Sequence, residues 1–196
     1  LAVDPAKGAS RRRPAKVADE VQPILKERDP AQQLARLRAS AHPQAQFLWS
    51  IFRDLFHYCA VHLADIAHNA RDVDFAIRWG FGWSRGPFEL WQAAGWQQVA
   101  KWIEEDVAAG KAMARAPLPK WVMDGRQGVH APEASLSAAT GQMEPRSRLP
   151  VYARQLFPEQ VLGEKAPDRG TTVFEDDGVR MWHQGDGIAI VSFKSK

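Results

Sequence analysis

Three closely spaced glycines, Gly80, Gly82 and Gly86, are the residues of this sequence whose spacing comes nearest to a cofactor site. They lie in the stretch RWGFGWSRGPFELW, residues 78–91. A Gly-x-Gly-x-x-Gly turn between a strand and a helix binds a dinucleotide because it aims the helix N-terminus at the pyrophosphate. Here the spacing is one residue too long, and the pattern on both sides of the turn is helical. The sequence therefore favours a corner between two helices over a nucleotide loop.

The corner interpretation gives the glycines and the tryptophans around them a structural role. Glycine permits positive φ and close approach of two backbones, and large aromatic side chains can cover the joint between two helices. The residues expected to form this corner are Gly80, Gly82, Gly86, Trp79, Trp83 and Trp91.

Other side chains that could do chemistry do not make a complete site. His57 and His68 share one face of a predicted helix, but eleven residues at a rise of 1.5 Å place them about 16 Å apart. No metal-binding His or Cys motif is present. Ser50 and Ser84 have no evident base partner. We expect no catalytic residue, no metal ligand and no cofactor-binding residue in this chain.

The elements that would hold the corner are predicted to be helices. Residues 44–69 form the strongest one, about 25 residues long, because apolar side chains recur at spacings of three and four. Its expected inward residues are Leu48, Ile51, Phe52, Leu55, Cys59, Leu63 and Ile66. A second helix is expected to begin at Asp72 and end at Gly80, with Val73, Ala76 and Ile77 inward. A third is expected to begin at Pro87 and end at Gly95.

Shorter elements are expected on either side of these helices. Residues 14–28 have a helical pattern that Pro23 should break or kink, and Asp29-Pro30 should open a helix reaching about Ala39. Residues 96–109 predict a further helix. Residues 110–170 hold most of the prolines and predict an irregular connector, whereas 171–196 contain β-type runs separated by turn residues. Such a strand and hairpin are marginal alone, so a larger sheet is expected to complete them.

The overall composition is typical of a globular protein and limits its class. The chain has 196 residues, of which 45% are hydrophobic, and a net charge of +3, which does not by itself indicate nucleic-acid binding. Cys59 is the only cysteine, so no intrachain disulfide can form and a reducing, cytoplasmic location is expected. No apolar run reaches the roughly 18 residues of a membrane span, and no signal peptide is evident. Both ends look cut, so we expect a segment of a longer protein.

The corner also resembles a known signature. The 3-hydroxyacyl-CoA dehydrogenase C-terminal domain carries a motif that reads roughly Asp-x-Ala-Met, Gly-x-Gly and Met-Gly-Pro-Phe-Glu-Leu. The residues similar to it here are Asp72, Val73, Asp74, Ala76, Ile77, Gly80, Gly82, Gly86, Pro87, Phe88, Glu89 and Leu90. The resemblance covers about residues 44–109. Ser84-Arg85 stands where Pro-Met is usual, and Gln92 stands where the family often has Asp.

The C-terminal stretch resembles a second family. Residues 178–194, GVRMWHQGDGIAIVSFK, are similar to the first hairpin of the crotonase (enoyl-CoA hydratase) fold. The order of the two resemblances is similar to that in bacterial bifunctional β-oxidation proteins. There two helical dehydrogenase repeats occur, and this one would be the second, because no Rossmann domain runs directly into it.

These resemblances imply a fold class and a division of the chain. The fold is expected to be mainly α, a helical dehydrogenase C-terminal-like domain with an irregular connector and a C-terminal β-hairpin. Residues 1–43 would be linker and short helices, 44–110 the helical domain, 111–170 the connector, and 171–196 the truncated start of a crotonase-like domain.

The function implied is part of fatty-acid β-oxidation. The intact protein would be an NAD-dependent 3-hydroxyacyl-CoA dehydrogenase, fused to enoyl-CoA hydratase, that acts on acyl-CoA. The family's catalytic residues do not map onto this chain, so the segment would be an inactive packing domain that binds no NAD. Its partners would be the first helical repeat and the Rossmann domain of the same polypeptide, with no nucleic acid and no membrane. The isolated chain is expected to self-associate.

The corner is in addition a candidate wall of the acyl-CoA cleft. The residues that would line it are Phe81, Trp83, Pro87 and Phe88. Two other hypotheses stay open at this point: a nucleic-acid binding module built on the basic N-terminus and exposed tryptophans, and a free-standing acyl-CoA binder.

Overall fold

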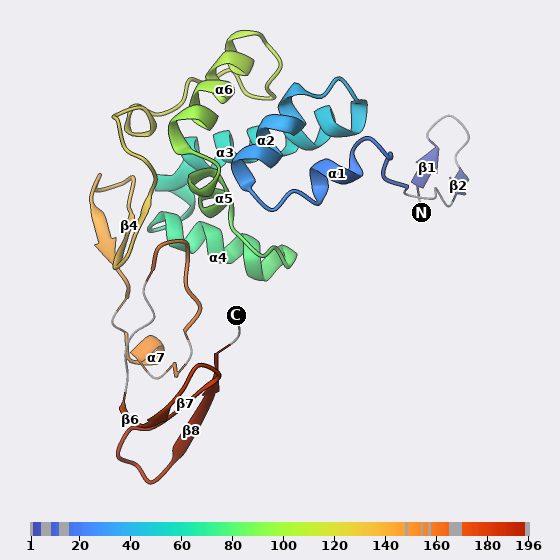
Figure 1. Ribbon diagram of the computed structural model, residues 1–196. Coiled ribbons are helices and arrows are strands. Elements are labelled where there is room, and N and C mark those ends of the chain that lie inside the picture. The colour runs from blue at the N-terminus through green and yellow to red at the C-terminus, as the bar shows by residue number, and fades with distance from the viewer. Residues whose placement is uncertain are drawn as a thin grey trace.

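A long central helix organises the fold. The computed structural model describes residues 2–4, 9–11, 16–147, 149–153, 155–156, 158–164 and 170–194. Helix α3 (Pro43–Ile66) runs through the middle of a helical body (Figure 1). The other helices are α1 (Gln22–Leu25), α2 (Pro30–Ala39), α4 (Ala70–Phe81), α5 (Pro87–Ala93), α6 (Trp96–Ala108), a 3-10 turn (Lys120–Val122) and α7 (Pro150–Ala153). The chain is mainly helical, which confirms the predicted fold class.

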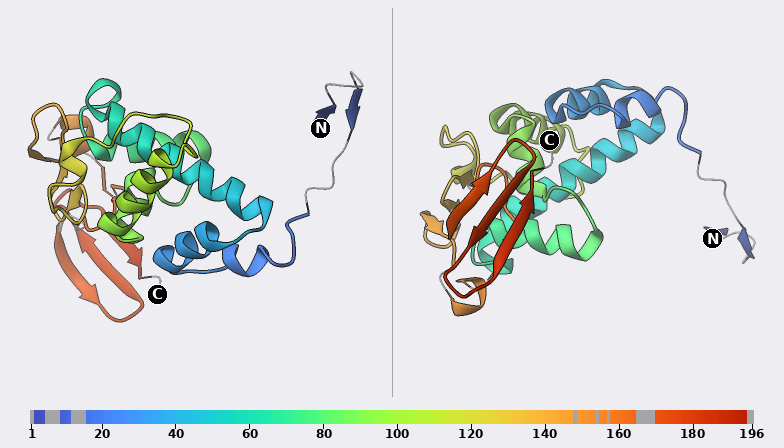
Figure 2. Two further views of the ribbon diagram at one scale, coloured as in Figure 1. Left: turned by 90° about the horizontal axis from the view of Figure 1, so that it is seen from above. Right: turned by 60° about the horizontal axis from the view of Figure 1, so that its bottom comes forward.

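Short antiparallel strands make up the rest of the regular structure. They are β1 (Ala2–Asp4), β2 (Ala9–Arg11), β3 (His130–Ala131), β4 (Ala134–Leu136), β5 (Met143–Pro145), β6 (Thr171–Glu175), β7 (Val179–His183) and β8 (Ala189–Phe193). β1 pairs with β2, β3–β4–β5 form one sheet, and β6–β7–β8 form another. The two views of Figure 2 show the β1–β2 pair away from the helical body.

Proline and a side-chain cap set the start of two helices, and the start of α2 agrees with the prediction. Asp29 accepts a hydrogen bond from the backbone of Ala31 at 3.0 Å, and Pro30 begins α2. His42 caps α3 in the same way, and Pro43 is its first residue. The expectation for Pro23 was wrong. This residue lies in the first turn of α1, where a missing N–H costs nothing, so it helps begin a four-residue helix instead of breaking a longer one.

Helix α3 has the predicted length, and its inner face agrees with the prediction in part. Cys59 and Leu63 are buried as expected, and Leu48, Phe52 and Leu55 pack against the core. The 24 residues of the helix also bury Trp49, Arg53, Phe56 and Ala60, whereas the predicted inward residue Ile51 is exposed. Ile66, also predicted inward, is exposed as well. The helix carries apolar side chains around much of its circumference, so periodicity alone did not distinguish the face that packs from the face that does not.

A second apolar face of α3 therefore lies in solvent. Phe47, Ile51 and Tyr58 follow each other at spacings of four and seven, which places them on one side of the helix. Phe47 is 63% exposed and Tyr58 is 53% exposed. We call these three residues the outer stripe of α3. Scattered apolar side chains are ordinary on a protein surface, but a row along one helix is typical of a contact surface.

Helix α4 begins and ends slightly outside its predicted bounds. Asn69, not Asp72, is the N-cap, and its side chain accepts a hydrogen bond from the Asp72 backbone at 3.3 Å. The helix continues through Gly80 and ends at Phe81, because Gly82 adopts the left-handed conformation with φ of 69°. Of the predicted inward residues Val73 is buried, whereas Ala76 is exposed.

The hydrophobic core crosses the boundaries drawn from the sequence. Leu34 and Leu37 of α2 are fully buried in it together with residues of α3, α5 and α6. Val122 and Leu136 from the connector are buried in the same core. The described residues of this connector are mostly irregular, as predicted, yet part of it packs in the core of the helical body. The division of the chain into separate domains stays a prediction.

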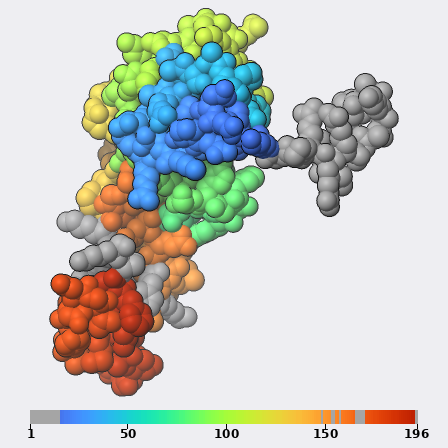
Figure 3. Space-filling model, turned by 45° about the vertical axis from the view of Figure 1, so that its right-hand side comes forward, coloured from blue at the N-terminus to red at the C-terminus, as the bar shows by residue number. Residues whose placement is uncertain are grey.

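The sheet β6–β8 lies at one end of the molecule. Figures 1 and 3 show it apart from helices α1–α6, at the far end of the connector. Val179, Met181, Val191 and Phe193 share one face through the β7–β8 register, and Phe193 is 82% exposed. The predicted strand and hairpin are thus confirmed, with an apolar face in solvent. None of the helices in the described part of the chain is both long and apolar enough to cross a lipid bilayer.

Candidate functional site

The corner between α4 and α5 is built around one buried carboxylate. Asp74 of α4 is fully buried, and its Oδ1 accepts a hydrogen bond from the backbone N–H of Phe88 at 2.8 Å. Its Oδ2 accepts a second from the backbone N–H of Glu89 at 3.1 Å. The first backbone N–H groups of a helix have no partner within the helix. Asp74 therefore caps α5 from a neighbouring helix and fixes the angle of the corner.

The glycines of the corner have three different roles. Gly86 must be glycine because a Cβ there would lie 2.3 Å from the Cα and the Cβ of Asp74. The backbone N–H of Gly86 also donates to Glu89 Oε2 at 2.8 Å, so that side chain closes the first turn of α5. Gly82 ends α4 with a positive φ. Gly80 lies within α4, and a Cβ there would meet nothing within 4 Å.

This geometry does not fit a dinucleotide. A phosphate would need the free N–H groups at the start of a helix, and those of α5 already bind Asp74. A helix also precedes the turn, where a dinucleotide loop needs a strand. Gly82 and Gly86 therefore bend and pack the chain, and NAD has no fitting site at this corner.

A second buried contact extends from the same carboxylate to the connector. His130 Nε2 lies 2.6 Å from Asp74 Oδ2, and His130 Nδ1 lies 2.8 Å from Ser135 Oγ. When Nε2 donates to Asp74, a neutral ring accepts from the Ser135 hydroxyl through Nδ1. His130 is on β3 and Ser135 is on β4, so this chain of hydrogen bonds attaches the small sheet to α4.

The Asp74–His130–Ser135 arrangement has the residue types of a hydrolase triad but not its setting. Ser135 is 1% exposed, and the Asp74 and His130 side chains are completely covered. A nucleophile must be reached by a substrate carbonyl next to a set of oxyanion donors. Ser135 lines neither of the two best-formed cavities among the described residues, so no substrate space borders it there. The arrangement is a structural clamp.

Burial dominates the electrostatics of the clamp. It raises the pKa of the Asp74 carboxyl above its usual value, while the hydrogen bond from His130 opposes that rise. Burial, with a smaller contribution from Asp74, raises the pKa of the Cys59 thiol to about 12. Cys59 is therefore a protonated core residue at neutral pH and not a nucleophile.

Gln92 reinforces the clamp from α5. Its side-chain Oε1 accepts hydrogen bonds from the backbone N–H groups of Val129 at 2.8 Å and His130 at 2.9 Å. Its Nε2 donates to the His130 carbonyl at 3.1 Å. Gln92 thus pairs with the β3 segment as a neighbouring strand would, which an aspartate could not do because it has no donor.

The tryptophans of the predicted corner separate into different environments. Trp91 is fully buried and stacks on Trp96 with ring centroids 4.2 Å apart, so it packs the joint as predicted. Trp83 is half-buried and contacts Phe52 edge to face at 6.0 Å. Trp79 does not pack the joint. It is 66% exposed, and its indole N–H donates to Glu159 Oε2 at 3.2 Å.

The proposed cleft-wall residues also differ in accessibility. Phe81 is 73% exposed at the end of α4, and Trp83 lines an open cavity. Pro87 and Phe88 are buried, and Phe88 lies in the aromatic core beside Trp91 and Trp96. The structure therefore leaves only Phe81 and Trp83 of the four in contact with solvent, and their role at a cleft stays a prediction.

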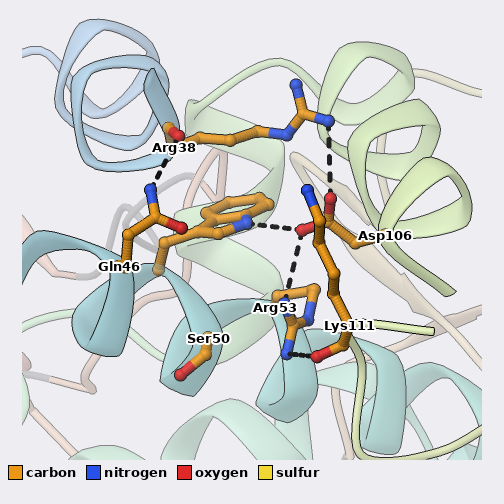
Figure 4. Close-up of a pocket in the computed structure, with 7 residues that line it drawn as sticks. Arg38, Gln46, Ser50, Arg53, Asp106 and Lys111 are labelled. Atoms are coloured by element: carbon orange, nitrogen blue, oxygen red, sulfur yellow. Dashed lines mark hydrogen bonds and ion pairs between the residues drawn. The ribbon is translucent and has the colours of Figure 1, made fainter. Parts of the chain in front are cut away.

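A polar cavity of about 470 Å³ lies where α2, α3 and α6 meet (Figure 4). Asp106 is buried there, and its Oδ2 accepts hydrogen bonds from the indole of Trp49 at 2.7 Å and from Arg53 at 3.3 Å. Arg38 reaches Asp106 Oδ1 at 3.5 Å from the opposite side. We call this space the α6 cavity.

Opposite charges balance around the α6 cavity. Arg53 donates twice to Asp54, and Arg38 forms a 2.7 Å ion pair with Glu105. The cations at or beside the cavity are Arg38, Arg53 and Lys111, and the anions are Asp54, Glu105 and Asp106. The local net charge is therefore zero. The structural role of these ion pairs and hydrogen bonds is to hold α2, α3 and α6 together. Figure 4 shows the side chains of Arg38 and Arg53 directed at Asp106.

A second cavity, of about 380 Å³, borders the corner and has a different lining. We call it the corner cavity. Phe52, Trp83 and Leu90 provide apolar surface, and Gln33 comes from α2. Two arginines, Arg28 before α2 and Arg85 in the corner turn, also line it. Sequence reasoning singled out Trp83 here but not the arginines, because nothing in their local spacing joins positions 28 and 85.

Residues 158–164 bind along α4 through a third set of contacts. Arg71 forms a 2.7 Å ion pair with Glu164, whose side chain is buried, and Arg78 donates to Glu159 at 3.1 Å. Both guanidinium groups lie over the ring of Phe75, that of Arg71 at 4.3 Å and that of Arg78 at 4.9 Å from the ring centroid. This segment is called the α4 strap. It fixes the connector to the helical body just before the chain reaches β6.

The described residues include no group of three or more His, Cys, Asp or Glu placed to hold a metal ion. The features that a function can use are thus the buried clamp, the corner cavity beside it and, as a separate surface, the outer stripe of α3.

Comparison with known proteins supports a relation to one enzyme family. The chain is 26% identical over 155 residues to a protein of Bacillus subtilis (strain 168) named "Probable 3-hydroxyacyl-CoA dehydrogenase". The match covers 77% of this chain but only 18% of that protein. No family model and no solved structure matches the chain. The similarity supports a relation to 3-hydroxyacyl-CoA dehydrogenases, which are oxidoreductases.

Proposed function

We propose that this chain is a non-catalytic helical packing segment of an NAD-dependent 3-hydroxyacyl-CoA dehydrogenase that acts in fatty-acid β-oxidation. The observation that carries the proposal is the corner. The residues that resemble the dehydrogenase signature are the same residues that build it: Asp74 caps α5, Gly86 permits the close approach, and Glu89 closes the first turn. The resemblance of the signature thus rests on residues with a defined structural role in this chain, and it supports the proposal beside the 26% identity.

The packing role is supported by apolar surface on two parts of the chain. The outer stripe of α3 leaves Phe47, Ile51 and Tyr58 exposed, and one face of the β6–β8 sheet leaves Val191 and Phe193 exposed. Surfaces of this kind are typical of protein contacts. Under the proposal, the first helical repeat of the same polypeptide covers the stripe, and further strands of an enoyl-CoA hydratase domain cover the sheet.

The chemistry under this proposal belongs to other parts of the polypeptide. The corner does not fit NAD, because the helix N-terminus that a phosphate would use is capped by Asp74. The clamp offers no accessible nucleophile, since Ser135 and its partners are covered. What this chain contributes is a rigid surface on which the catalytic domains assemble.

An assay of separate and joined pieces tests the proposal. The 196-residue chain, incubated with NAD⁺ and 3-hydroxyacyl-CoA of several chain lengths, is expected to produce no NADH and to give no heat on titration with NAD⁺. The longer polypeptide that contains the chain is expected to oxidise the same substrates. Dehydrogenase turnover by the isolated chain would contradict the packing role. A longer polypeptide with no dehydrogenase activity would contradict the family assignment.

A further inference from the structure

The corner cavity combines an apolar surface with unpaired positive charge. Phe52 and Trp83 meet edge to face at 6.0 Å, and Leu90 adds an aliphatic side chain beside them. The cavity has a volume of about 380 Å³, near the lower end of the roughly 300–1,000 Å³ range of small-molecule sites. A single ring with one attached group fits a space of that size.

The two arginines of this cavity differ from those of α2, α3 and α4. Arg38, Arg53, Arg71 and Arg78 each form an ion pair with a carboxylate. No side-chain hydrogen bond or ion pair is found for Arg28 or Arg85 within the described part of the chain, and both are exposed. Guanidinium groups bind carboxylates and phosphates through two parallel hydrogen bonds.

The carboxylate that lines this cavity, Glu27, already has hydrogen-bond and ion-pair partners. Glu27 accepts hydrogen bonds from the backbone N–H groups of Arg28 at 2.9 Å and Asp29 at 3.2 Å, and it pairs with Arg36 at 3.5 Å. The Glu27 carboxylate thus binds the turn before α2 and Arg36, and it does not pair with the guanidinium groups of the two lining arginines. The local balance of charge favours an anion, in contrast to the α6 cavity.

We propose that the corner cavity binds a small organic anion, a phosphate or carboxylate attached to a flat apolar ring. Arg28 and Arg85 bind the anionic group, and Trp83 and Phe52 contact the ring. Both halves are needed, because two exposed arginines alone bind inorganic anions weakly in water and an aromatic edge alone gives little selectivity. The site lies within the helical body, so it does not depend on the dehydrogenase assignment or on any other domain.

Isothermal titration of the 196-residue chain with phenyl phosphate tests this site. Phenyl phosphate is expected to bind at least about tenfold more tightly than inorganic phosphate, which lacks the ring, and than benzyl alcohol, which lacks the charge. Arg28→Gln combined with Arg85→Gln is expected to weaken binding by about tenfold or more, because two charge-assisted contacts are lost. Trp83→Leu is expected to weaken phenyl phosphate while leaving inorganic phosphate unchanged.

The matched control is Arg115→Gln, which removes an exposed arginine outside the cavity. It is expected to leave binding unchanged, and circular dichroism of each variant shows whether the helices are intact. Binding should also fall as sodium chloride is raised, since the contact is ionic. Absence of phenyl phosphate binding, equal binding by the double variant, or equal affinity for inorganic phosphate would each overturn the proposal. Because neither NAD nor acyl-CoA is used, the result is independent of the test of function.

Discussion

At the scale of single residues, the corner depends on Asp74. This carboxylate receives two backbone hydrogen bonds from α5 and one contact from His130, all in a fully buried position. A buried acceptor with several donors is costly to replace, because each donor then loses its partner out of reach of water.

Asp74→Asn is therefore expected to destabilise the chain by about 2–4 kcal/mol. The amide can accept through one oxygen only, and its NH2 group meets donors instead of acceptors. Urea unfolding followed by circular dichroism measures the change. Asp72→Asn is the matched control, since Asp72 lies exposed in the first turn of the same helix and its side chain there is worth only about 0.3–1 kcal/mol. Equal losses for the two variants would contradict the capping role of Asp74.

The same substitution should change how stability depends on pH. Burial raises the pKa of Asp74 in the folded chain above the ordinary 3.8, so folding favours its protonated form. Its contribution to stability is then fully present below that ordinary value and is lost as the pH rises through the raised one. His130 from β3 and Glu89 from α5 face this carboxylate and are unchanged by the substitution. The stability advantage of the unsubstituted chain over Asp74→Asn is expected to shrink as the pH rises from about 4. A constant or growing advantage would contradict the raised pKa.

Two glycines of the motif should respond to alanine in opposite ways. Gly86→Ala is expected to cost about 2–3 kcal/mol, because the new Cβ would lie 2.3 Å from the Asp74 backbone. Gly80→Ala is expected to stabilise the chain by about 0.5–1 kcal/mol, since it lies inside α4 with open space around it and alanine is the better helix former. Thermal unfolding of both variants decides this. Destabilisation of similar size at both positions would show that the two glycines have the same role.

At the scale of elements, local signals predicted the fold better than they predicted the packing. Asp29-Pro30 and Pro87 each marked a helix start correctly, because caps and the fixed φ of proline act within a few residues. The inner face of α3 was predicted only in part: Cys59 and Leu63 are buried as expected, whereas Ile51 and Ile66 are exposed. Apolar residues lie on two sides of that helix, and only the neighbouring helices decide which side is buried.

The candidate site was predictable only in part for a related reason. The glycines and Trp91 were assigned to the corner from sequence, but the clamp joins Asp74 to His130 and Ser135, which are more than fifty positions away along the chain. Buried polar residues such as Arg53 and Asp106 were missed too, since hydropathy places charged residues outside. Such pairs are defined by tertiary contacts, and periodicity within one segment carries no information about them.

At the scale of the whole molecule, the connector is fixed to the helical body at two places, while other surfaces of that body stay exposed. The clamp attaches the connector to α4 at β3 and β4, and the α4 strap attaches it again through Arg71 and Glu164. The core is thereby closed on the side of α4 and α5. The outer stripe of α3 receives no such cover among the described residues, as the exposure of Phe47 and Tyr58 shows.

This open stripe leads to a prediction about association. In solution the isolated chain is expected to form a dimer at high concentration, because two copies can bury the stripe against each other about a two-fold axis. Each aromatic or aliphatic side chain buried in this way contributes about 1.5–3 kcal/mol. Phe47→Ser combined with Tyr58→Ser is therefore expected to weaken dimerisation at least about tenfold in sedimentation equilibrium. Phe81→Ser, which removes an equally exposed aromatic from the end of α4, should leave the dimer unchanged. A strictly monomeric chain at high concentration would show that the stripe does not drive self-association, and equal effects of the two changes would place the contact elsewhere on the surface.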